Sequence, residues 1–486
     1  MFTKLSRSND VCTSFFAALF SPLLFFGVFL SLSGCSGSSA VQGSQNSVPP
    51  SLSSVQISPL NPTIAAGTTQ QFFATARYSD TSTKDVTSSS NWTSSDSNSA
   101  TIQSMNQMNP GLATGVAAGS ATITVTFNGM NSSTVLTMTA AAGNGDKIPL
   151  IDMTPAQNYL TFPGGLYENV SNTPPSDHDA AGVMTASMVQ PLDASGNPSA
   201  SGKIVLVSIG RSAEQDEFNV FVQQAGANSS VNHTSMVLTN GALTGIFPCA
   251  WTVAAGPPSC SPTLGNQYDR VRDTVLAPLG VTEQQVQIVW IEEYNADPAS
   301  DGFQSLCDPT LAGCTNTVNH TEALRYEEQL GAILRAAKTR WPNLQQAFHS
   351  SRVFAGYATS DHNPEPYAYE YGFSVKWLIE AQICQLRTAS NTNCANIGQV
   401  DPLAGDLNYK NGTVPWTAWS AYLWGNGSMP RSDGLVWCNG QPVAPCSSEM
   451  DYQNDGTHLN LTGQQKAANL LLNYFLSSPY TPWFRL

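Results

Sequence analysis

Two short segments contain residue types that can together make a hydroxyl group reactive. In the first, Gly210 and Arg211 precede Ser212 directly after an apolar run. A glycine at that position lets a strand turn sharply into a helix, which exposes the serine hydroxyl and backbone N–H. In the second, Asp455 stands three residues before His458. In a tight turn, such an aspartate can hold one ring nitrogen while the other takes a proton from a serine.

Two further segments offer uncharged hydrogen-bond donors. Gly241 follows the apolar run TSMVLT and Asn240, and Asn295 follows the run QVQIVWIEEY. A glycine gives a bare backbone N–H and an asparagine gives a side-chain amide. An oxyanion hole needs fixed donors of this kind. Turn geometry alone also explains a glycine or an asparagine in a loop, so both explanations stay open.

The elements that must position these residues are strands alternating with helices. The continuous apolar runs KIVLVSIG and QVQIVWIEEYN are typical of strands buried on both faces. The segments HTEALRYEEQLGAILRAAKTRW and LTGQQKAANLLLNYFLSS have apolar residues at three- and four-residue spacings, as amphipathic helices do. Residues 148–486 are therefore expected to form an α/β domain with a mostly parallel sheet. Sites in such sheets lie beyond the carboxyl ends of the strands, which is where the candidates occur.

The order of these four segments, and the DGTH turn before the last helix, resemble the SGNH (GDSL-like) hydrolase superfamily. The resemblance implies a three-layer α/β/α, flavodoxin-like fold and acyl transfer through a serine, without a metal or cofactor. It implies that Ser212 is the nucleophile, His458 the general base and Asp455 its orienting carboxylate. It also implies that the Ser212 N–H, Gly241 and Asn295 form the oxyanion hole.

Two segments depart from the family pattern. The GDS of the family is Gly-Arg-Ser here, and its GxND is EYNA at residues 293–296. The departures leave the serine, histidine and aspartate unchanged and place Arg211, Glu292 and Glu293 near the expected pocket. Arg211 would then either bind a carboxylate or polar group of a substrate or pair with an acidic side chain such as Glu214.

The resulting expectation is an exported serine esterase that hydrolyses a carboxylic ester. An acetyl group on an extracellular polysaccharide is the candidate substrate. Residues 355–373 and 416–437 are rich in Tyr and Trp, which either stack on sugar rings at a cleft mouth or pack in the core. The sequence leaves the identity of the ester and the oligomeric state open.

Two other classes of function compete with this expectation. One is a non-catalytic surface protein that binds glycans or mediates adhesion on a decayed hydrolase scaffold, which the altered segments motivate. The other is a metal-dependent hydrolase that uses the acidic and histidine residues of segment 177–179 (DHD) or segment 361–362 (DH). Nothing near either segment completes a ligand set.

Residues 53–140 show a different pattern, in which short alternating runs such as QQFFATARY and ATITVTF are separated by turn residues. This period of two is typical of an antiparallel sandwich, with Trp92 as a candidate core residue. The strings PTIAAGTTQQFFATARYSD, DVTSSSNWTSSDSNSATI and GLATGVAAGSATITVTF resemble the bacterial Ig-like domain of group 2. The resemblance implies a small all-β spacer or adhesion module without catalytic residues.

The N-terminal 35 residues have the features of an export signal. Lys4 and Arg7 precede an apolar run over residues 15–32, and Cys35 follows Leu-Ser-Gly. The end of this segment resembles the lipobox of bacterial lipoproteins, which implies lipidation of Cys35 and membrane anchoring in the cell envelope. A plain signal peptide or a single membrane anchor is the alternative. Residues 36–52 are expected to be a flexible tether and residues 141–147 a linker.

Charge and cysteine content agree with an exported protein. Lys and Arg number 20 against 34 Asp and Glu, a formal charge of −14, which argues against nucleic-acid binding. Apart from Cys12 and Cys35, eight cysteines remain, and they fall in four close pairs without zinc-site spacing. We expect neighbour-to-neighbour disulfides, with reduced thiols as the alternative: Cys249–Cys260, Cys307–Cys314, Cys384–Cys394 and Cys438–Cys446.

Overall fold

A computed structural model describes residues 49–65, 69–107, 109–116, 119–139, 147–258, 260, 262–310, 313–388, 394 and 397–486. The expected signal peptide with Cys35, most of the tether and most of the linker lie outside these residues. Within the described part, no helix combines the length and apolar character that a membrane span requires.

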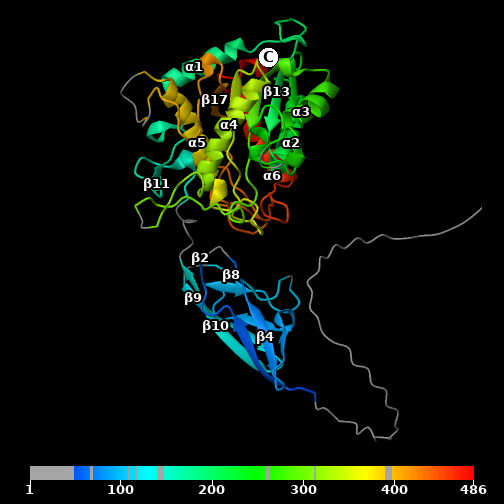
Figure 1. Cartoon of the computed structure of the whole chain (residues 1–486), viewed down its shortest axis with the longest axis vertical. Coiled ribbons are helices and arrows are strands. Elements are labelled where there is room, and N and C mark those ends of the chain that lie inside the picture. Colours follow the sequence, from blue (N-terminus) through cyan, green and yellow to red (C-terminus); the bar gives the residue numbers. More distant parts are fainter. Residues whose placement is uncertain are drawn as a thin grey trace, which may run out of the picture.

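The first described region is built of strands (Figure 1). Its buried apolar residues form a core of their own. Trp92 is 3% exposed there, and its Nε1–H donates to the Thr87 carbonyl at 3.0 Å, so its expected place in the core is confirmed. Its sheets have the orders β1-β4-β5, β2-β10-β9-β6 and β3-β8-β7. The strands are β1 (Leu52–Ser58), β2 (Thr63–Ala65), β3 (Thr69–Gln71), β4 (Phe73–Tyr78), β5 (Thr83–Asp85), β6 (Asn91–Ser94), β7 (Ala100–Ile102), β8 (Leu112–Gly115), β9 (Gly119–Phe127) and β10 (Met130–Thr139).

The second region contains a parallel five-stranded sheet of order β14-β13-β15-β16-β17 and a small hairpin of β11 and β12. Its strands are β11 (Asn158–Tyr159), β12 (Phe162–Pro163), β13 (Ile204–Ile209), β14 (Met236–Thr239), β15 (Val286–Ile291), β16 (Gln346–His349) and β17 (Trp416–Trp419). Its helices are α1 (Ser176–Met188), α2 (Ser212–Ala227), α3 (Gln267–Arg270), α4 (Glu322–Arg340), α5 (Tyr367–Leu386) and α6 (Leu461–Ser477).

Apolar side chains cover both faces of the parallel sheet. On β13, Val205 and Val207 belong to one apolar cluster together with residues of α4 and α5. Ile204 and Leu206 belong to the other cluster, together with Phe221 of α2 and residues of α6. Because successive side chains of a strand point to opposite faces, a strand buried on both faces must be apolar throughout. The run IVLVSI meets this requirement apart from Ser208, and all six residues are buried.

Of the two explanations for the aromatic-rich segments, the buried rings follow the second, packing in the core. In segment 416–437 the chain forms strand β17, and Trp416, Trp424 and Trp437 have no exposed surface. In segment 355–373 the chain enters helix α5, where Tyr369 and Phe373 are likewise buried. These rings fill the core because a sheet flanked by helices needs bulky apolar side chains on both faces.

The eight cysteines of the second region form the four expected disulfides between sequence neighbours. The two cysteines of each bond are 7 to 11 positions apart in the sequence, so each bond closes a short loop. The bonds are Cys249–Cys260, Cys307–Cys314, Cys384–Cys394 and Cys438–Cys446. Disulfides of this kind persist in oxidising compartments.

Candidate functional site

Ser212 is the first residue of α2, three positions after the end of β13. The turn between the two elements requires Gly210. A Cβ atom on Gly210 would lie 2.5 Å from Glu214 Cβ and 2.7 Å from the Glu292 carbonyl oxygen, closer than real contacts allow. The side chain of Ser212 is half-buried. The tight turn thus leaves its hydroxyl within reach of a ligand.

Asp455 and His458 lie in the turn that precedes α6. The backbone N–H groups of Thr457 and His458 both donate to Asp455 Oδ1 at 3.1 Å, which fixes the carboxylate. Gly456 adopts φ +69°, and a Cβ atom there would overlap the carbonyl of Tyr357. Only glycine adopts this positive φ readily and also leaves room for the Tyr357 carbonyl.

The structure brings the three residues together. Ser212 Oγ lies 2.8 Å from His458 Nε2, and His458 Nδ1 lies 2.5 Å from Asp455 Oδ2. The side chains of His458 and Asp455 are 19% and 38% exposed, so the group sits at the protein surface. A serine, a base within hydrogen-bond reach and a group that orients the base are the elements of an activated nucleophile.

The carboxylate of Asp455 is held in its charged form. Partial burial raises its pKa, but the hydrogen bonds from His458 and Thr457 lower it, and the net shift of the pKa is downward. An ionised Asp455 at neutral pH fixes the Nδ1–H tautomer of His458, so that Nε2 is free to accept a proton from Ser212.

Sequence reasoning considered His362 only for metal binding and did not place it, or Tyr294, beside the serine. Tyr294 Oη lies 3.3 Å from Ser212 Oγ and 3.2 Å from His362 Nε2. The rings of His362 and His458 stack with centroids 5.5 Å apart. Burial lowers the pKa of His362, and the positive charges of Arg211 and His458 lower it further. Tyr294 follows β15 as Ser212 follows β13, and that parallel position was the signal available in the sequence.

Arg211 is a buried cation without an anionic partner. It is 7% exposed, and its Nε and Nη1 have no hydrogen-bond partner among the described residues. The guanidinium lies over the rings of Phe247 and Tyr294, at 4.6 and 5.3 Å from their centroids. The expected pairing of its side chain with Glu214 does not form. Glu214 pairs with Arg352 instead, at 2.8 Å, and the Arg352 guanidinium also lies 4.1 Å from the centroid of the Tyr294 ring.

Four carboxyl groups lie buried behind the serine turn. Glu214 accepts a hydrogen bond from the Arg211 backbone N–H at 3.0 Å and thereby clamps the turn. Burial raises the pKa of Glu214, Glu217, Glu292 and Glu293. Glu292 and Glu293, which the sequence placed near the pocket, are each 1% exposed and lie behind the serine turn. Neutral carboxyl groups can stay in such a dry environment at a smaller cost than charged ones.

The donors expected for an oxyanion hole are engaged elsewhere. The Gly241 N–H donates to Ser208 Oγ at 3.1 Å. The Asn295 side chain donates to Glu322 Oε1 at 2.7 Å and to Gln329 Oε1 at 2.9 Å. A buried donor takes the nearest acceptor, and the fold supplies one to each of them. Of the three expected donors, the Ser212 N–H at the start of α2 is the one that remains a candidate.

The segments considered for metal binding make other contacts. His178 Nε2 lies 3.0 Å from the Thr417 carbonyl, and Asp177 pairs with Arg387 at 3.0 Å. Asp361 accepts a hydrogen bond from the hydroxyl of Ser300. Within the described residues, no three or more His, Cys, Asp or Glu side chains are grouped so that they could hold a metal ion.

The N-terminal region belongs to a known family of domains. The bacterial Ig-like domain (group 2) matches residues 51–138. These residues therefore form a bacterial Ig-like domain, as the sequence resemblance indicated.

Two kinds of known protein share similarity with part of the chain. Ice-binding protein 1 of Shewanella frigidimarina (strain NCIMB 400) is 39% identical over 98 residues, which cover 20% of this chain and 11% of that protein. The chain thus spans about a tenth of the length of this relative. The solved structures of S-layer protein SbsC domains 4 and 5 and domains 5-6 are each 23% identical over 19% of this chain, with TM-scores of 0.17. The matches cover 54% and 45% of those chains.

Proposed function

We propose that the protein is a serine esterase of the SGNH class, in which residues 148–486 form the α/β/α catalytic domain. One observation carries the proposal: Ser212 Oγ, the His458 ring and the Asp455 carboxylate form a continuous hydrogen-bonded chain of 2.8 and 2.5 Å. The sheet order supports it as well. Strand order reverses between β13 and β15, and ligands of open α/β sheets bind beyond the strand ends at such a point.

The geometry supports acyl transfer through Ser212. Its hydroxyl attacks an ester carbonyl while His458 Nε2 takes the proton, and Asp455 stabilises the resulting imidazolium. His458 then gives the proton to the departing alcohol. Water repeats the sequence on the acyl-enzyme, with His458 again as the base. General base catalysis of this kind contributes roughly 10² to 10⁴ in rate.

In this proposal one expected oxyanion donor remains, the Ser212 N–H, and two other groups take the places of Gly241 and Asn295. The Ser212 N–H belongs to the first turn of α2, whose N–H groups have no acceptor within the helix and carry its positive dipole end. The Tyr294 hydroxyl lies 3.3 Å from Ser212 Oγ. The unpartnered guanidinium of Arg211 lies against the same ring. A buried cation without an anion is costly, so a developing oxyanion beside it is favoured.

The proposed setting is the cell envelope. The four disulfides fit an oxidising compartment. In this proposal Cys35 carries the lipid anchor, the Ig-like domain is a spacer, and the substrate is an acylated polysaccharide outside the cell. Replacement of Cys35 by Ser would then move the protein from the membrane fraction to the soluble fraction.

The decisive experiment compares hydrolysis of p-nitrophenyl acetate by the wild type, Ser212→Ala and Ser230→Ala. The exposed Ser230 is the matched control. We expect Ser212→Ala to lose nearly all turnover and the control to keep it. Equal rates for the wild type and Ser212→Ala would refute the assignment. A wild type without turnover on a panel of esters, but with retained glycan binding, would favour the non-catalytic surface protein instead.

A further inference from the structure

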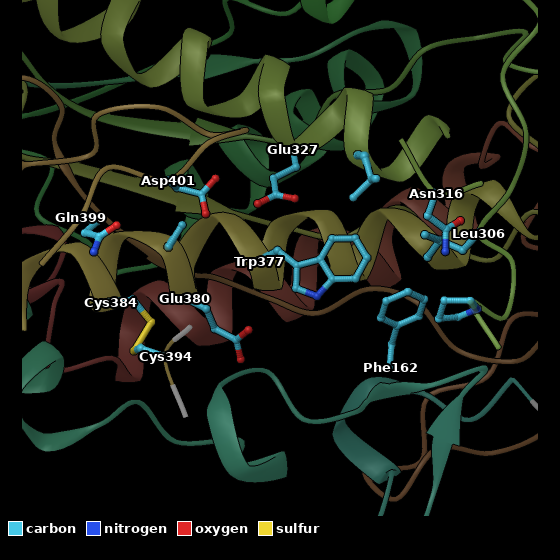
Figure 2. A pocket seen from close by; sticks show the side chains of 13 residues that line it. Phe162, Leu306, Asn316, Glu327, Trp377, Glu380, Cys384, Cys394, Gln399 and Asp401 are labelled. Carbon is cyan, nitrogen blue, oxygen red and sulfur yellow. A yellow bond between two sulfur atoms is a disulfide. The ribbon is translucent and has the colours of Figure 1, made fainter. Parts of the chain in front are cut away.

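A cavity of about 520 Å³ lies between helices α4 and α5, and none of its lining residues belongs to the Ser212–His458–Asp455 group (Figure 2). Glu327 projects from α4 and Trp377 from α5, and Phe162 closes one side with its ring 5.2 Å from that of Trp377. The Cys384–Cys394 disulfide forms part of the wall. A cavity of this size between packed helices can enclose a small organic molecule.

Glu327 is an unpartnered carboxyl group inside this cavity. It is 5% exposed, and it has no hydrogen bond or ion pair with any described residue. Burial raises its pKa well above the usual value, and the carboxylates of Asp401 and Glu380 raise it further. The oxygens of Glu327 are not among the fully enclosed, unpartnered polar atoms of the described residues, so they open into the cavity, where a hydrogen-bond donor on a ligand can reach them.

The charges around the cavity indicate what that ligand carries. Glu327, Glu380 and Asp401 are acidic residues among those that line the space (Figure 2), and no Lys, Arg or His is among the described residues that line it. The neighbouring Lys376 forms an ion pair with Glu380 at 3.8 Å and also donates to two backbone carbonyls. The described carboxylates are not grouped to hold a metal ion, so an organic cation fits the site better.

We propose that this cavity binds a ligand that presents a primary ammonium ion on a flat, partly apolar body. The ammonium ion donates to Glu327 and lies near Glu380 and Asp401, and the body packs on the faces of Trp377 and Phe162. Hydrogen bonds between charged groups and cation–π contacts both strengthen where neighbouring side chains limit the access of water. The proposal is independent of the esterase activity, because it uses none of the residues around Ser212.

The first test measures binding of two matched pairs of probes by isothermal titration calorimetry on the full-length protein. Benzylammonium is compared with benzyl alcohol, and glucosamine with glucose, so that each pair differs in the ammonium group. We expect the ammonium member of at least one pair to bind roughly 10- to 100-fold more tightly than its neutral partner. The pair that responds distinguishes an aromatic amine from an amino sugar. Equal or undetectable binding within both pairs overturns the proposal.

The second test assigns the binding to the cavity. Glu327→Gln keeps the shape of the side chain and removes the anion, and Trp377→Leu removes the aromatic face. Each should weaken binding of the preferred probe by about tenfold or more. Glu328→Gln, the exposed neighbour on α4, is the matched control and should bind like the wild type. Undiminished binding to both Glu327→Gln and Trp377→Leu, with unchanged circular dichroism spectra, would rule the cavity out.

Discussion

The Tyr294 hydroxyl lies 3.3 Å from Ser212 Oγ although 82 residues separate the two in sequence. The parallel pairing of β13 with β15 explains this proximity. Ile209 of β13 pairs with Ile291 of β15. Ser212 and Tyr294 each follow the paired residue of their own strand by three positions. Because strand ends of a parallel sheet meet at one edge, Ser212 and Tyr294 emerge side by side.

Replacement of Tyr294 by Phe removes the hydroxyl and keeps the ring that the Arg211 and Arg352 guanidinium groups contact. Loss of one oxyanion donor typically costs about 10² to 10³ in turnover. We expect kcat for p-nitrophenyl acetate to fall by roughly this factor while KM changes little. Steady-state kinetics decide the matter, and an unchanged kcat would mean that the hydroxyl serves only to position His362.

Arg211 offers a test of how the unpartnered guanidinium is used. With an uncharged acetate ester, Arg211→Met should lower kcat by about 10² or more if the cation stabilises the oxyanion. Arg211→Lys retains the charge and should recover part of the rate. If the cation instead binds a carboxylate of the natural substrate, both variants would hydrolyse p-nitrophenyl acetate at the wild-type rate.

Asp455→Asn tests the orientation of the imidazole. The amide cannot fix the tautomer that leaves His458 Nε2 as an acceptor, and equivalent changes in Ser-His-Asp enzymes lower turnover by roughly 10⁴. The two backbone donors to Oδ1 still find an oxygen in Asn, so the fold should be retained. A melting temperature near that of the wild type together with undiminished turnover would show that Asp455 has no catalytic role.

The buried carboxyl group of Glu217 should make the free energy of unfolding depend on pH. Its carboxyl oxygens have no partner among the described residues, and burial together with nearby carboxylates raises its pKa from 4.5 to about 8. Between pH 4.5 and about pH 8, the folded protein therefore binds more protons than the unfolded chain. Its contribution to stability is present below the unfolded pKa of 4.5 and is lost as pH rises toward the folded pKa of about 8.

Glu217→Gln should remove this dependence. Relative to the wild type, the variant should gain on the order of 2–4 kcal/mol in free energy of unfolding between acidic and mildly alkaline pH. Urea unfolding of both proteins across this range measures the difference. The exposed Glu328→Gln is the control and should follow the wild type. Parallel curves for Glu217→Gln and the wild type would contradict the raised pKa.

Local patterns in the sequence determined several elements. The strands β13 and β15 and the helices α4 and α6 follow from apolar periodicity, which depends on neighbours within one element. The disulfides follow from short spacing, because two cysteines that close a small loop have few other partners within reach. The turns around Ser212 and Asp455 carry their own glycines, so these candidates were visible before the fold was known. Their catalytic roles stay a prediction.

The tertiary structure alone decided which polar groups are free. Asn295 looks like an available donor in sequence, but Glu322 and Gln329, from a helix about 30 residues further on, occupy its amide. The guanidinium of Arg211 lacks an anion because Arg352 already holds Glu214. Hydrogen-bond satisfaction depends on every atom within a few ångströms, and residues distant in the chain supply most of those atoms. Sequence therefore indicated where chemistry can occur, and packing determined which groups remain available for it.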